Sequence, residues 1–311
     1  MSEVDGRTRH YGDFYGVLDA AQDDRPLLLI WGNCQAEALR VVFDTVDQLS
    51  YRTVRVPAVH ELVETDVPHV RRLAAETAVL LSQPIRAGYR DLPIGTDDLT
   101  ALLPADGRVL HWPVVRWSGL EPFSAIVRDP NDPGADPPVV PYHDLRTLAQ
   151  AARAGAGEWD VEVPAETIRD VAEDGLAELR RREQQGTDIA VSDLLMQHGA
   201  GAMHTIDHPG NPVLLALADR VLDELGEPGK PVDPGRTLLG TTKSPREARV
   251  LEALGLPTED ARTGWEHAGH TWTEEEVRAA QLAWYAERPA VVEAGKQRYA
   301  DLIAQLGLDI G

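Results

Sequence analysis

The only cysteine of this 311-residue chain, Cys34, lies in the segment Gly32-Asn33-Cys34-Gln35. The apolar run before it, residues 27–31, predicts a buried strand, and the spacing of apolar residues after it predicts a helix over residues 35–46. The first N–H groups of a helix are unpaired and partly positive, so a thiol there is shifted toward the nucleophilic thiolate. The pattern therefore favours a reactive cysteine over a cysteine that packs in the core as a small hydrophobic side chain.

The residues around Cys34 have groups that could stabilise a developing negative charge. Backbone N–H groups at a helix start hold an oxyanion, Gly32 allows close approach of a substrate, and Asn33 adds a side-chain donor. Gln35 follows in the same turn, and Gln83 stands at the end of another apolar run. We expect Gly32, Asn33, Gln35 and Gln83 to line the substrate site.

A cysteine nucleophile needs a base within hydrogen-bond reach, and two histidines are candidates for it. His204 and His208 lie about 170 residues downstream, a separation that unrelated nucleophile–base pairs also show. They precede a predicted helix, so we expect them on a loop, with Asp207 and Asn211 as orienting partners. Either histidine fits the role of base, and we slightly favour His204.

The other histidines carry weaker signals. His111 falls in a predicted strand and is expected to be structural, whereas His143, between Tyr142 and Asp144, could line the site. His267 and His270 have no third metal ligand nearby, so a surface loop is the better interpretation and no metal is expected.

The elements that position these residues alternate between strand and helix in the first part of the chain. Strands are predicted over residues 27–31, 51–57, 77–81 and 109–112, and helices over 35–46, 61–75 and 97–103. This alternation predicts a small, parallel, doubly wound α/β sheet of about four strands. Ligands of such sheets bind at the carboxyl ends of the strands, where Cys34 and Gln83 are placed.

The second part of the chain is expected to be mainly helical. Helices are predicted over residues 144–154, 165–185, 190–197, 212–225, 245–254 and 274–306, the last interrupted at Pro289. Asn211 and Ser244 are expected to cap the helices that follow them. We therefore divide the chain into an N-terminal tail and short helix (1–25), an α/β sheet region (26–141) and a helical region packed on it (142–311). Within the first of these, residues 1–9 are expected to be a tail and residues 13–21 a short helix.

Four motifs in order resemble the WcbI-type polysaccharide biosynthesis putative acetyltransferases. They are Gly32-Asn33-Cys34-Gln35; residues 81–86 (LSQPIR) with Tyr89-Arg90; residues 141–144 (PYHD); and residues 204–209 (HTIDHP) with Asn211-Pro212. The resemblance spans residues 26 to about 226 and implies an acetyltransferase that uses coenzyme A and a cysteine/histidine site.

Coenzyme A carries phosphate groups, so the resemblance implies basic residues near the site. Arg86 and Arg90, after the third predicted strand, are the first candidates. Arg40 and Lys243 are the second choices, the latter because residues 240–244 precede a predicted helix start. Surface salt bridges with the abundant carboxylates are the alternative role for the arginines.

Three functions remain open at this point. The leading one is transfer of an acyl group, from coenzyme A or an acyl carrier protein, to a sugar, polysaccharide precursor or natural product. Either Cys34 takes the acyl group covalently, or a histidine activates the acceptor while the cysteine turn serves as oxyanion hole. The alternatives are a cysteine thioesterase or esterase, and a non-catalytic module that binds coenzyme A or another ligand.

Composition sets the remaining limits. The net charge of −21 argues against a general nucleic-acid or anionic-membrane surface. A single cysteine cannot form an intrachain disulfide, no apolar run is long enough to span a bilayer, and the first residues are polar. We therefore expect a soluble cytoplasmic protein, whose oligomeric state the sequence leaves open.

Overall fold

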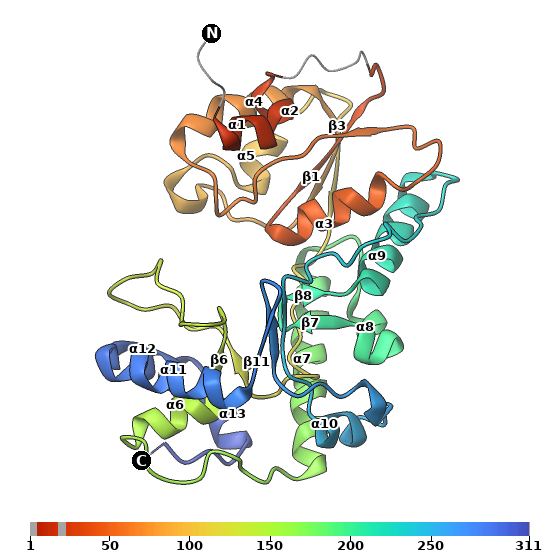
Figure 1. Cartoon of the computed structure of the whole chain (residues 1–311). Coiled ribbons are helices and arrows are strands. Elements are labelled where there is room, and N and C mark those ends of the chain that lie inside the picture. The colour runs from red at the N-terminus through yellow and green to blue at the C-terminus, as the bar shows by residue number, and fades with distance from the viewer. Residues whose placement is uncertain (1–4, 18–22, 311) are drawn as a thin grey trace. The chain divides into compact units, whose positions relative to one another are not determined.

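The computed structural model describes residues 5–17 and 23–310, which form two compact units (Figure 1). The sheet unit takes its residues from 1–115, 179–198 and 210–239, and the helical unit from 116–178, 199–209 and 240–311. The expected division at residue 141 follows chain order. The observed units instead interleave, because the chain passes repeatedly from one to the other.

Residues 5–16 contain more helix than the sequence suggested. Helix α1 (Gly6–His10) is capped by Asp5, whose carboxylate accepts from the Thr8 N–H at 3.0 Å, so residues 6–9 are helical rather than a tail. Helix α2 (Gly12–Tyr15) ends at Gly16 in the left-handed conformation. The helix expected over 13–21 therefore stops early, and its residues 18–21 lie outside the described residues.

The sheet unit is built on the parallel α/β sheet that the sequence predicted. Its order is β2–β1–β3–β4, with all neighbours parallel. The strands are β1 (Leu27–Trp31), β2 (Arg52–Thr53), β3 (Thr77–Ser82) and β4 (Arg108–His111). Strand β2 is shorter than expected: Arg52 and Thr53 pair with β1, whereas Val54 and Val56 are buried in the core without extending the ladder.

Helices cover both faces of this sheet, as expected of a doubly wound fold (Figure 1). Alternate residues of β1, among them Leu29 and Trp31, pack with Val70 and Leu73 of α4 on one face. Helix α3 contacts β1 and packs against α9. The helices of this unit are α3 (Cys34–Phe43), α4 (Val67–Glu76), α5 (Thr96–Thr100), α8 (Ser192–His198) and α9 (Asn211–Leu225), with the short 3-10 turns η1 (Glu64–Asp66) and η2 (Tyr89–Asp91).

The register brings the carboxyl ends of three strands to one edge. Trp31 pairs with Ser82, and Ser82 pairs with His111. Backbone bonds continue the pairing one residue further, from Gln83 N–H to Trp31 O (2.9 Å) and from Trp112 N–H to Ser82 O (3.0 Å). The turn that contains Cys34 therefore begins beside Gln83.

The helical unit combines helices with three small antiparallel sheets. Its helices are α6 (Leu145–Ala152), α10 (Ala248–Ala253), α11 (Glu274–Glu287), α12 (Pro289–Arg298) and α13 (Ala300–Gln305), with η3 (Gly199–Gly201) and η4 (Thr258–Asp260). Its strands are β5 (Ser124–Ala125), β6 (His143–Asp144), β7 (Met203–Thr205), β8 (His208–Pro209), β9 (Thr242–Lys243), β10 (Trp265–His267) and β11 (His270–Trp272). The long helix α7 (Ala165–Gly186) contributes residues to both units.

Two helix starts differ from the sequence-based expectation. The N-cap of α9 is Gly210, whereas Asn211 is the first helical residue. Helix α10 starts at Ala248 after the N-cap Glu247, three residues later than predicted. Ser244 does not cap the helix, because its N–H and its hydroxyl both donate to His204 O of β7.

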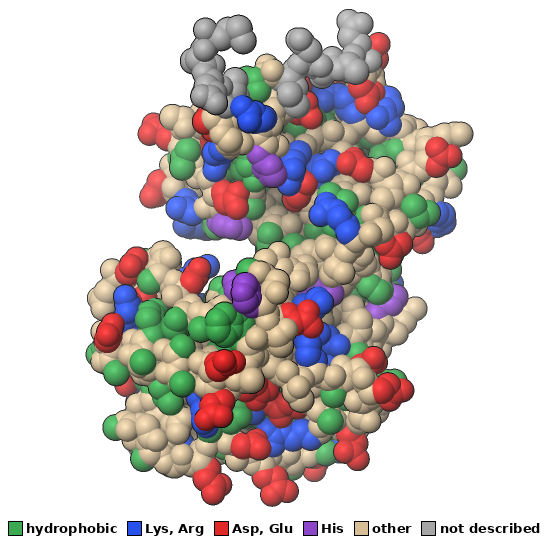
Figure 2. All heavy atoms as spheres, viewed as in Figure 1, with side chains coloured by type: hydrophobic (Ala, Val, Ile, Leu, Met, Phe, Trp, Pro, Cys, Tyr) green, Lys and Arg blue, Asp and Glu red, His purple; other side chains and the backbone are tan. Residues whose placement is uncertain are grey.

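On the face in Figure 2, basic and acidic side chains are interspersed. Of the helices in residues 5–17 and 23–310, none has the length and apolar character needed to cross a membrane.

Candidate active site

Cys34 is the first residue of α3 and follows directly on β1 and the turn. We call residues 32–35 the cysteine turn. Asn33 caps the helix: its side-chain oxygen accepts from the Gln35 N–H at 2.9 Å, and its own backbone is extended. The thiol is not part of a disulfide, and Cys34 is partly exposed. This is the helix-start position at which a thiolate is stabilised.

The two glutamines fix this turn from the interior. Gln83 Oε1 accepts from the Asn33 N–H at 2.9 Å, and Gln83 Nε2 donates to Gln35 Oε1 at 3.2 Å. Gln35 is fully buried, donates to Val115 O at 2.8 Å and accepts from the Val115 N–H at 3.0 Å. The side-chain amides of Gln35 and Gln83 thus bond to the protein itself. Their role is to hold the cysteine turn in place.

Gly32 is required where Gln83 passes the backbone. A Cβ on Gly32 would lie 2.5 Å from Gln83 Oε1 and 2.7 Å from its Cδ, well inside contact distance. A side chain at position 32 would therefore displace the amide that accepts from Asn33.

His204 and His208 lie on a hairpin of the helical unit, not on the loop that was expected. We call residues 203–209 the histidine hairpin: Thr205 pairs with His208, and Ile206-Asp207 form the two-residue turn between β7 and β8. Trp117 N–H donates to Ile206 O at 2.9 Å, and Ser244 N–H donates to His204 O at 3.0 Å. These bonds hold the hairpin on both sides.

His208 belongs to a hydrogen-bonded cluster with Tyr142. The Tyr142 hydroxyl donates to Asp207 Oδ1 at 2.7 Å and lies 3.4 Å from His208 Nδ1. Because the phenol proton is committed to Asp207, a contact with His208 requires an N–H at Nδ1, which leaves the lone pair on Nε2. Burial lowers the pKa of His208, and the negative charge of Asp207 partly opposes this.

His204 has a different environment. Burial lowers its pKa to about 4, and the positive charges of Lys243, Arg262 and Arg246 lower it further. Its Nε2 is buried and has no hydrogen-bond partner among the described residues. The ring is therefore neutral at pH 7, and a proton taken up there would be poorly stabilised.

Four other histidines that the sequence analysis considered are held by neighbouring residues. His143 is 1% exposed, with Nδ1 2.5 Å from Tyr285 Oη and Nε2 3.1 Å from Val127 O, so it does not line a substrate site. His111 contacts Asp188 through its backbone N–H and Nδ1. His267 and His270 pair across a hairpin whose turn is Ala268-Gly269, which explains their spacing. Among residues 5–17 and 23–310, no group of three or more His, Cys, Asp or Glu could hold a metal.

The four basic candidates differ in how far they are already engaged. Arg40 is bound by Glu37 (2.7 Å) and Asp44 (2.5 Å), and Lys243 by Glu266 (2.7 Å). Arg90, with a left-handed backbone, donates to His60 O. Arg86 is exposed, makes no ion pair with any described residue, and lines a hollow of about 540 Å³ at the ends of β3 and β4. Arg86 therefore keeps its charge available for a ligand.

Asn211 is not an orienting partner of an imidazole. Its amide nitrogen donates to Arg236 O at 2.8 Å, and its oxygen accepts from the Leu238 N–H at 2.9 Å. Asn211 thus uses both side-chain atoms to fasten the segment around residues 236–238 within the sheet unit.

The sequence of residues 27–230 matches the model of one family, the polysaccharide biosynthesis enzyme WcbI. The chain belongs to the WcbI family of polysaccharide biosynthesis enzymes. A solved structure of WcbI shares its fold, with a TM-score of 0.77 at 17% identity over 91% of this chain and 98% of that one. That structure is described as the native protein without a disulfide bond between coenzyme A and one of its cysteines. No curated protein matches the chain.

Sequence reasoning missed several residues that the WcbI fold places around the histidine hairpin. Tyr142 lies in the motif of residues 141–144, in which the sequence points to its neighbour His143 instead. Thr205 donates to Tyr142 Oη at 2.9 Å, and Arg246 and Arg262 contribute charge at His204. No local pattern marks these arginines, because long-range pairing of β7 with the segment after β9 brings them there.

Proposed function

We propose that the protein transfers an acyl group from coenzyme A to a hydroxyl or amino group of a sugar or polysaccharide precursor. The observation that carries this proposal is the position of Cys34 at the first residue of α3, in a turn held by Asn33 and Gln83. A thiolate is favoured there, and N–H groups of the same turn are suited to a developing oxyanion. The description of the WcbI structure in terms of coenzyme A and a cysteine supports a thioester as donor.

In the covalent route, the Cys34 thiolate attacks the thioester carbonyl, and the carbon–sulfur bond to coenzyme A breaks. Coenzyme A leaves as a thiol after it takes up a proton, and Cys34 holds the acyl group. A base then removes the proton of the acceptor hydroxyl, whose oxygen attacks the acyl-cysteine and regenerates the thiolate. In the direct route the acceptor attacks the thioester itself, and the cysteine turn stabilises the oxyanion.

We assign the base to His208, although the sequence slightly favoured His204. A catalytic base works best with a pKa near the working pH, and the Asp207 carboxylate favours a proton on His208. At His204 burial and three cations oppose the same proton. His204 then acts as a neutral hydrogen-bonding group toward the acceptor.

For coenzyme A itself, the hollow beside β3 and β4 is a suitable place because doubly wound sheets bind ligands outside the carboxyl ends of their strands. We propose that Arg86 binds a phosphate group there. Cys34 and Gln83 lie at the same sheet edge. Arg90 and Lys243 remain secondary candidates, since each already has a partner.

The test is acyl transfer from acetyl-coenzyme A in the wild type and in Cys34→Ala, His208→Gln and His204→Gln. Intact-protein mass spectrometry should show one acetyl group on the wild type and none on Cys34→Ala. Loss of the base should reduce the rate about 10²–10⁴-fold, and the Cys34/His208 double variant should be no worse than either single variant. Wild-type rates in both histidine variants would refute the proposal that a histidine is the base. If the rate of thioester loss does not depend on added acceptor, the protein is a hydrolase instead.

A further inference from the structure

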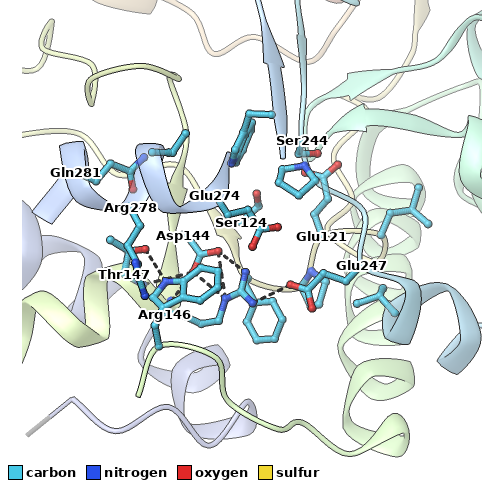
Figure 3. Close-up of a pocket in the computed structure, with 18 residues that line it drawn as sticks. Glu121, Ser124, Asp144, Arg146, Thr147, Ser244, Glu247, Glu274, Arg278 and Gln281 are labelled. Carbon is cyan, nitrogen blue, oxygen red and sulfur yellow. Dashed lines mark hydrogen bonds and ion pairs between the residues drawn. The ribbon is translucent and has the colours of Figure 1, made fainter. Parts of the chain in front are cut away.

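A cavity of about 40 Å³ lies inside the helical unit, lined by β5, β6, α6, α11 and the segment around Ser244 (Figure 3). One water-sized group needs roughly 10–15 Å³, so the cavity has room for about two to four such groups. Its wall includes Trp159 and Trp265, together with four carboxyl groups, two arginines and the amide of Gln281.

Glu121 is a buried carboxyl group without a hydrogen-bond donor. It is 6% exposed, and neither side-chain oxygen has a partner among the described residues. The Ser244 hydroxyl lies beside it, but that hydroxyl donates to His204 O at 3.0 Å. Burial raises the pKa of Glu121 to about 8, although Ser244, Arg246 and Arg262 lower it, and Asp207 adds a smaller upward effect.

Gln281 brings a second unpartnered acceptor to the same cavity. It is 1% exposed, and its Nε2 donates to Tyr142 O at 2.7 Å. Its Oε1 has no partner in the part of the chain that the structure describes. Buried acceptors without donors cost free energy, so two of them in one cavity point to a ligand that donates hydrogen bonds.

The charges of the lining favour a cation. Arg146 is already neutralised by Asp144 at 2.7 Å and Glu247 at 2.8 Å, as the dashed lines in Figure 3 show. Four carboxyl groups of the lining outnumber its two arginines, Arg146 and Arg278. Arg246 and Arg262 lie outside the lining and also act on Glu121. An anion would meet this excess of carboxyl groups, whereas a cation would be attracted by them.

We propose that this cavity binds the primary ammonium group of a small amine or amino-sugar ligand, with Glu121 and Gln281 as its hydrogen-bond acceptors. An ammonium group has three donors and a charge, whereas a hydroxyl group has one donor and none. A primary ammonium group can therefore donate to both Glu121 and Gln281, and its charge offsets the negative charge of the lining. The site uses no residue of the cysteine turn.

The test is titration of the full chain with ethylammonium chloride, followed by the indole N–H resonance of Trp159 in ¹H–¹⁵N spectra. That N–H donates to Thr147 Oγ1 at 2.8 Å in the cavity wall, so it should report occupancy. With three non-hydrogen atoms, the ligand should bind with a Kd of about 1 mM or weaker. Ethanol and sodium chloride, which match its size and ionic strength, should leave the resonance unchanged.

Glu121→Gln should weaken ethylammonium binding about tenfold or more, because a charge-assisted bond is lost while the shape is kept. The matched control is Glu275→Gln, an exposed carboxylate of α11 outside the cavity, which should bind as the wild type does. Gln281→Met provides a second variant and should also weaken binding.

Binding should also strengthen between pH 6.5 and 8.5, because Glu121 must release its proton to accept from the ammonium group. The charges that act on Glu121 come from Arg246, Arg262 and Asp207. Equal shifts with ethanol and ethylammonium, or an unchanged Kd in Glu121→Gln, would overturn the proposal and leave the cavity to water.

Discussion

The Tyr142 hydroxyl donates to Asp207 Oδ1 across 2.7 Å, which joins the residue before β6 to the turn of the histidine hairpin. Thr205 donates to the same phenol oxygen at 2.9 Å, and Trp265 stacks on the Tyr142 ring at 5.8 Å. Burial and the Asp207 charge raise the pKa of Tyr142, so the phenol keeps its proton at neutral pH. Tyr142 therefore orients Asp207 beside His208.

Tyr142→Phe should remove this orientation without removing the ring. We expect kcat to fall about tenfold, with KM for the acyl donor little changed, and the acidic limb of the pH–rate profile to move. The control is Tyr285→Phe, which breaks a buried bond to His143 in the same unit and should cost stability while the pH profile stays as in the wild type. An unaltered profile in Tyr142→Phe would remove Tyr142 from the site.

Gly32→Ala should disturb the cysteine turn through the amide of Gln83. The added Cβ would lie 2.5 Å from Gln83 Oε1, so the bond to the Asn33 N–H should be lost. We expect the alkylation rate of Cys34 by iodoacetamide at pH 7 to fall several-fold and stability to decrease by about 1–3 kcal/mol. Gly6→Ala, where a Cβ meets nothing within 4 Å, is the control and should leave the rate unchanged. A normal Cys34 rate in Gly32→Ala would show that the Gln83 bond is dispensable.

Arg86→Ala should weaken coenzyme A binding by about 1–3 kcal/mol, as expected when a charge-assisted phosphate contact is lost. Isothermal titration calorimetry measures this directly. Arg71→Ala removes another exposed arginine of the sheet unit, from α4, and should bind coenzyme A normally. If Arg86→Ala and Arg71→Ala bind equally well, the phosphate site must lie elsewhere, with Lys243 as the next candidate.

His143 should make stability depend on pH below neutrality. Burial lowers its pKa from 6.5 to about 4, so between these values the unfolded chain binds a proton that the folded protein does not. The contribution of His143 to the free energy of unfolding is present in full above about pH 6.5. It decreases as the pH falls toward 4, by about 2 kcal/mol at pH 5.

Urea unfolding at pH 7 and pH 5 tests this expectation. The decrease in the free energy of unfolding from pH 7 to pH 5 should be about 2 kcal/mol smaller in His143→Gln than in the wild type. His60→Gln, a change at an exposed histidine, should behave as the wild type does. Equal drops in all three proteins would show that His143 is not the titrating group.

The sequence by itself determined the framework around Cys34. Five apolar residues, a glycine turn and a helical repeat are local signals, because backbone sterics and burial of one face act over a few residues. The parallel direction of the strands followed from their alternation with helices. The same local signals predicted α9 but placed its cap one residue late at Asn211, whose side chain bonds to the segment around residue 238 instead.

Only the tertiary structure decided the environments of the functional side chains. Gln35 and Gln83 are 48 residues apart, and their mutual bond exists because β1 and β3 are neighbours. His204 and His208 have similar sequence signals, yet cations surround one and a carboxylate supports the other. Such differences arise from charges and burial supplied by residues distant in the chain, which no local pattern of amino acids encodes.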